Sequence, residues 1–158
     1  MAIGSLTKLK SSKAFAKYLF SDTDMSGKKC ESVEVIGGTF SCDNEKELKW
    51  YFDTFHKFHP TIEKHLAHMI ISFPDNEREI EYFEAYDIGD RWAEEMGFDG
   101  YIIMRRNKRI HIGASRCLMN NKVVSDSWDW KKSESILRKI EKEFNLIKTP
   151  SSHLNKAS

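Results

Sequence analysis

The sequence is poor in cysteine and in proline, with three of each, and it has no long apolar run. The cysteines, Cys30, Cys42 and Cys117, are odd in number and widely spaced. This excludes a secreted disulfide framework and a CxxC zinc knuckle, and it favours a reducing cytoplasm. Apolar runs such as residues 69–71 are too short to cross a bilayer, and the first ten residues lack a signal peptide's apolar region. We therefore expect a cytoplasmic protein without a membrane partner.

A strong charge of one sign is also missing, because the formal net charge is +1 at pH 7. Overall charge therefore does not predict a nucleic-acid partner, and a positive surface must come from local clustering. Four cations do cluster around a predicted two-residue turn, at Arg105, Arg106, Lys108 and Arg109. Such a hairpin tip either holds phosphate groups or keeps an exposed edge soluble, and the sequence leaves both roles open.

The hydrophobic pattern predicts one α+β domain, for which 158 residues supply a sufficient core. Helices are expected at residues 12–20, 44–58, 76–96 and 132–144. Strands are expected at residues 34–40, 66–73, 101–106, 109–117 and 122–125. Hairpin-linked strands with helices between them predict a two-layer sandwich, in which helices cover a mainly antiparallel sheet of about five strands.

Tyr18 and His111 are the single residues that most suggest chemistry. A tyrosine hydroxyl can attack a phosphodiester, but Tyr18 on a helix is also typical of a core residue with its hydroxyl at the surface. His111 lies between two isoleucines on a predicted strand and supplies at best one ligand of a metal site. Chelation by the other four central histidines together is not expected, because a proline separates the two pairs, His56 with His59 and His65 with His68.

Five segments share their order and spacing with one known family. They are residues 16–20 around Tyr18, the glycine-rich residues 36–39, residues 68–74 (H-x-x-x-S-F-P), residues 95–103, and residues 123–129 with the last helix. From residue 13 to residue 146 the chain resembles the conjugative relaxases, the nucleases that mobilise plasmids. The resemblance implies that Tyr18 is a nucleophile which forms a 5′-phosphotyrosyl link with DNA.

The chain departs from this family at the metal motif. Relaxases carry one histidine, a loop, and then histidine-hydrophobe-histidine, whereas this sequence reads Arg109-Ile110-His111 and places Arg106 near the first histidine. A divalent ion, Mg²⁺ or Mn²⁺, would be held weakly by His111 alone, or would be absent. Either Arg106 and Arg109 replace the metal while Tyr18 attacks, or cleavage has been lost and the cations only bind phosphate. The sequence leaves these explanations balanced.

The resemblance implies a relaxase-like domain over residues 1–150, and the polar composition of residues 151–158 predicts a disordered tail. It implies a DNA-binding protein of a mobile genetic element, which either nicks origin-of-transfer DNA or serves as a non-catalytic accessory module of the relaxosome. Its partners would be single-stranded or origin-type DNA and other relaxosome proteins. The expected catalytic residues are Tyr18, His111, Arg106, Arg109 and Ser72. The expected DNA contacts are Arg105, Lys108, Arg116, Lys13, Lys17 and Trp128, the last of which either stacks on a base or packs against the final helix.

Overall fold

The computed structural model describes residues 3–21, 23, 27–29, 33–74, 76–106, 108–125 and 129–146. Its elements, in chain order, are β1 (Ile3–Leu9), α1 (Ser12–Phe20), β2 (Val33–Gly38), α2 (Glu45–His56), β3 (Leu66–Ser72), α3 (Tyr82–Met96), β4 (Tyr101–Arg106), β5 (Arg109–Ser115) and α4 (Asp129–Glu143). The five strands pair antiparallel in the order β1-β3-β5-β4-β2. The predicted α+β fold with a five-stranded antiparallel sheet is confirmed. Cys30, Trp128 and the predicted tail lie outside the described residues.

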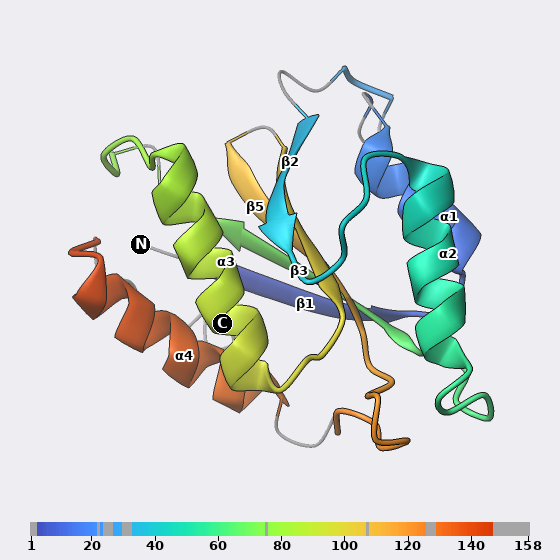
Figure 1. Cartoon of the computed structure of the whole chain (residues 1–158). Coiled ribbons are helices and arrows are strands. Elements are labelled where there is room, and N and C mark those ends of the chain that lie inside the picture. The colour runs from blue at the N-terminus through green and yellow to red at the C-terminus, as the bar shows by residue number, and fades with distance from the viewer. Residues whose placement is uncertain are drawn as a thin grey trace.

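Helices cover both faces of the sheet, so the molecule has three layers, and the expectation of two layers is wrong (Figure 1). Alternate residues of β3 explain this, because Met69 and Ile71 are buried against the α3–α4 side while Leu66 is buried on the α1–α2 side. A strand that is apolar on both faces needs cover on both. The sequence pattern gave no means of assigning each helix to a face.

Local signals set the helix ends largely as expected. Ser11 caps α1 by accepting a hydrogen bond from the Ala14 amide, and Asn44 caps α2 in the same way. Helix α3 ends at Gly97, whose φ of 95° suits a residue without a Cβ. It begins later than predicted, however, because residues 76–81 form a connecting loop. Tyr82, the first residue of the helix, is 50% exposed.

Two strand predictions differ from the structure. The N-terminal strand β1 was not predicted, because its sequence mixes glycine, serine and lysine with few apolar residues. It pairs along its whole length with β3, which is hydrophobic enough to hold a polar edge strand. The strand expected at residues 122–125 is reduced to one isolated bridge between Cys117 and Val123. None of the helices in the described ranges is long and apolar enough to cross a membrane.

Candidate functional site at the C-terminal end of α1

Helix α1 lies directly on the sheet because its apolar stripe meets a glycine. Phe15 and Leu19 are buried on this stripe, and Phe15 stacks on Phe52 of α2 with ring centroids 5.4 Å apart. On β5, a Cβ at Gly113 would stand 2.7 Å from Leu19 Cδ1, so any larger residue there would force the Leu19 side chain to shift. The close packing places Tyr18, one residue before Leu19, over the neighbouring strands.

Tyr18 forms a cluster with two histidines of the sheet. It is half-buried, and the centroid of its ring lies 5.6 Å from that of His68 and 6.4 Å from that of His111. The histidines come from adjacent strands, β3 and β5, where Ile70 is the partner of His111. Their rings are joined by a hydrogen bond of 3.0 Å between His68 Nε2 and His111 Nδ1. The predicted pair of Tyr18 and His111 is therefore brought together on one face.

His68 was not among the predicted catalytic residues, although it begins the family-like segment at residues 68–74. A strand pattern tells which residues share a face, but the register that sets His68 beside His111 comes from the pairing of β3 with β5. The family-like segment at residues 68–74 was therefore the only signal in the sequence that pointed to His68. The residue that His68 contacts in the cluster, His111, is far away in the chain.

Both imidazoles are neutral at pH 7. Burial, together with the nearby Arg106 cation, lowers the pKa of His68 to about 4. The pKa of His111 falls to about 3, again chiefly through burial, with further lowering by His68, Arg106 and Arg109. In their mutual hydrogen bond one ring donates and the other accepts, which requires at least one neutral ring. The cluster is thus an uncharged pair of bases beside a phenol and a buried cation.

Arg106 supplies that cation from the end of β4. Its guanidinium lies over the Tyr18 ring, 4.4 Å from the centroid, in a cation–π arrangement. Its Nη2 donates to the backbone carbonyls of Ser21 and Thr23, each at 3.2 Å, and the residue is only 2% exposed. Arg106 therefore fixes the segment after α1 against the sheet. Its predicted contact with the scissile phosphate stays a prediction.

The other predicted catalytic residues lie beside this cluster rather than within it. Arg109 is exposed at the start of β5, and Ser72 is the last residue of β3. Together with Arg105 and Lys108 they line a cavity of about 610 Å³ next to the β4–β5 hairpin. Ser72 thus belongs to the wall of this cavity. Its predicted catalytic role stays a prediction.

The remaining predicted DNA contacts divide into exposed and buried residues. Lys13 and Lys17 are exposed on α1, on the side away from its buried stripe. Arg116 lies past the opposite end of β5, is 6% exposed, and donates to the carbonyls of Lys64 and Val124. Its guanidinium holds two loops together, so we assign it a structural role instead of a DNA contact. Trp128 is outside the described residues.

Comparison with known families agrees with this geometry. Residues 18–146 match the family model described as relaxase, MobA/VirD2-like, nuclease domain. The chain belongs to this relaxase family. No curated protein and no solved structure matches it. The matched range begins at Tyr18 and includes His68, Arg106 and His111, so all four members of the cluster lie within the relaxase domain.

The cluster does not fit the divalent metal that the relaxase resemblance implies. Among the described residues, no three or more histidine, cysteine or acidic side chains are placed to hold a metal ion. His68 and His111 are bonded to each other, and the Arg106 charge already acts on both imidazoles. Protein metal sites need several preorganised ligands without a competing cation.

Proposed function

We propose that this relaxase-family protein binds a DNA strand and does not nick it by the metal-dependent route. It would then act as an accessory module that holds DNA within a mobilisation complex. The observation that carries the proposal is the buried Arg106, whose guanidinium lies on the Tyr18 ring and donates to two backbone carbonyls. A guanidinium held in this way stabilises the segment that follows α1. It therefore cannot move to contact a phosphate during a reaction.

Exposed cations on the β4–β5 hairpin and on α1 support the binding part of the proposal. Lys108 and Arg109 are exposed on the β4–β5 hairpin, and Lys13 and Lys17 are exposed on α1, whose C-terminal end is tied to β4 through Arg106. In Figure 1 the C-terminal end of α1 and this hairpin lie at the same end of the sheet. Lysine and arginine side chains neutralise phosphates and release counterions, which gives affinity without sequence readout.

The binding test is a titration of a fluorescently labelled, mixed-sequence single strand at increasing salt. Contacts from four cations predict a slope of about −3 in a plot of the logarithm of the association constant against that of the salt concentration. Tyr18→Phe is expected to bind as the wild type does. Absence of any binding at low salt would remove the DNA-binding proposal altogether.

Nicking by Tyr18 is the second candidate, because two imidazoles lie close to the phenol ring. In that step Tyr18 Oη would form a bond to phosphorus, and the bond from phosphorus to the 3′ oxygen would break. The phenol proton would pass to an imidazole of the pair, and the leaving 3′ oxygen would take up a proton. The product would be a 5′-phosphotyrosyl strand and a free 3′ hydroxyl.

A denaturing gel separates the two candidates. The protein is incubated with the labelled strand in EDTA, in Mg²⁺ and in Mn²⁺, alongside Tyr18→Phe under the same conditions. The non-cleaving proposal expects no covalent adduct in any lane. An adduct that forms with the wild type and disappears with Tyr18→Phe would establish nicking and overturn that part of the proposal.

A further inference from the structure

The cavity beside the β4–β5 hairpin is lined by both cationic and carboxylate side chains, whereas the Tyr18 cluster contains no carboxylate. It encloses about 610 Å³ and lies between the hairpin and the loop that joins β3 to α3. This volume is within the range of protein sites for small molecules, which is about 300–1,000 Å³. The hairpin contributes cations, whereas the loop contributes carboxylates, apolar side chains and Arg78, whose charge is paired with Glu84.

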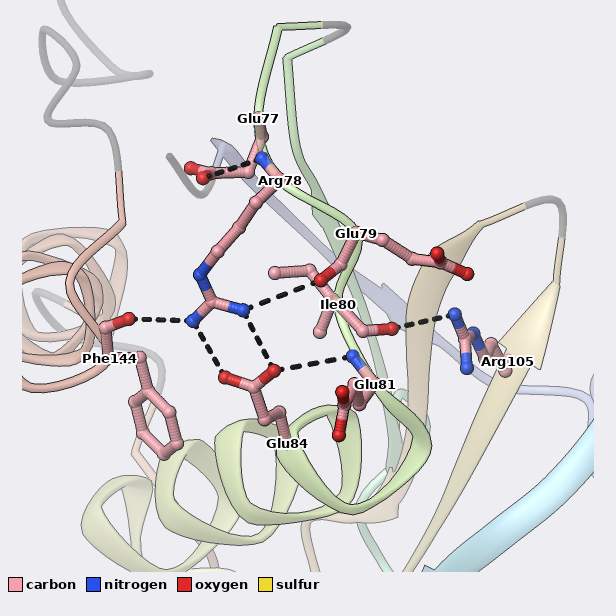
Figure 2. A network of polar contacts seen from close by, with 8 residues as sticks. All are labelled: Glu77, Arg78, Glu79, Ile80, Glu81, Glu84, Arg105 and Phe144. Carbon is pink, nitrogen blue, oxygen red and sulfur yellow. Dashed lines mark hydrogen bonds and ion pairs between the residues drawn. The ribbon is translucent and has the colours of Figure 1, made fainter.

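The loop wall is braced from several directions (Figure 2). Arg78 donates to both carboxylate oxygens of Glu84, at 2.8 and 2.7 Å, and to the Phe144 carbonyl at 2.8 Å. The bidentate pair lowers the pKa of Glu84, so the bridge persists over the neutral range. From the other wall, Arg105 Nη2 donates to the Ile80 carbonyl at 2.8 Å. These contacts tie the loop to α3, to the end of α4 and to β4, so the cavity is a preformed feature.

The hairpin wall carries two cationic side chains that form no ion pair among the described residues. Lys108 and Arg109 are exposed, and no carboxylate of the described residues forms an ion pair with either. Arg105 extends the positive wall inward while it holds the Ile80 carbonyl. A wall of this kind suits a phosphate group, whose oxygens accept hydrogen bonds from both lysine and arginine.

The loop wall suits a base instead. Phe73, Pro74 and Ile80 give it apolar surface, and Glu79 places an exposed carboxylate at the same cavity. A carboxylate accepts hydrogen bonds from the exocyclic amino group of a base such as cytosine, and thymine has no such group. Glu77 also lines the cavity and adds to the negative charge on this side.

We propose that this cavity is a nucleotide subsite, which holds the phosphate of one unpaired nucleotide on Lys108 and Arg109 and an amino-bearing base at Glu79. The proposal rests on the proposed DNA-binding function, because it assigns one position of the bound strand. The nucleotide is either an internal unit of that strand or a free mononucleotide, and the two sources share the same chemistry.

Titrations followed by amide NMR shifts test the subsite directly. The probes are dCMP, dTMP and inorganic phosphate, added to the wild type, to Lys108→Gln with Arg109→Gln, and to Glu79→Gln. We expect saturable shifts at the hairpin and at Ile80 with dCMP, about tenfold weaker binding of dTMP, and loss of that preference in Glu79→Gln. Equal binding of dCMP and dTMP by the wild type, or the same shifts with phosphate alone, would overturn the proposal.

A strand-binding arm separates the failure of this subsite from the failure of the proposed function. The matched control is Lys132→Gln with Lys142→Gln, which removes two exposed charges from α4 on the far side of the sheet from α1. The hairpin variant should lower the salt slope for the single strand by about 1, and the α4 control should leave it unchanged. If the wild type binds the strand with the same salt slope as the hairpin variant, the subsite is refuted and the proposed DNA binding is left intact.

Discussion

Acidification should unfold this protein through its buried histidines. His68 and His111 have an ordinary pKa of 6.5, which the fold lowers to about 4 and about 3. Between pH 6.5 and 4 the unfolded chain therefore binds protons that the folded chain does not, so the free energy of unfolding falls as pH falls. From pH 7 to pH 5 each imidazole contributes a loss of about 2 kcal/mol, or about 4 kcal/mol for the pair.

A third buried histidine adds to this loss. Burial and the stacked ring of His56 lower the pKa of His65 to about 4, and His65 is only 2% exposed. It therefore contributes about a further 2 kcal/mol over the same pH range. Since single domains have a free energy of unfolding of about 5–15 kcal/mol in total, a loss of this size is large.

Urea unfolding at pH 7, 6, 5.5 and 5 measures this dependence. His111→Gln should reduce the fall in the free energy of unfolding by about 2 kcal/mol, because one titrating group is gone. His59→Gln, outside the cluster, serves as the control and should retain the full dependence. A free energy that stays constant from pH 7 to pH 5, or that falls equally in His111→Gln and the wild type, would show that the imidazoles are not buried as neutral groups.

Three further substitutions or modifications test the packing around the site. Arg106→Met should lower the free energy of unfolding, measured in urea, by about 1–3 kcal/mol, because the Ser21 carbonyl loses its hydrogen-bond donor. An unchanged free energy would contradict the structural role of this guanidinium. Gly113→Val should destabilise by about 1–3 kcal/mol in urea, since the new side chain would overlap Leu19 and displace α1, and an unchanged value would contradict the close packing of α1 on β5. Burial raises the pKa of Cys42 to about 12, so peptide mass spectrometry should find it unalkylated by iodoacetamide at pH 8 until urea unfolds the chain.

The sequence by itself determined the four helices, most of the strands and the family. The apolar stripe of residues 12–20, the cap at Asn44 and the stop at Gly97 predict helices that the structure contains. The cationic turn between residues 106 and 109 predicts the β4–β5 hairpin, which has the expected strands. These features are decided by neighbours a few residues apart, so they are present in the pattern of the chain itself.

Only the tertiary structure decided which of the cations and histidines serve the site. Alternation along a strand separates Arg105 from Arg106, but it cannot tell which of the two faces will be covered by α1. The strand register brings His68 to His111, and the closeness of α1 at Gly113 brings Tyr18 to both. Because these contacts join residues 43 to 94 positions apart, their geometry depends on sheet order and packing, which no local pattern specifies.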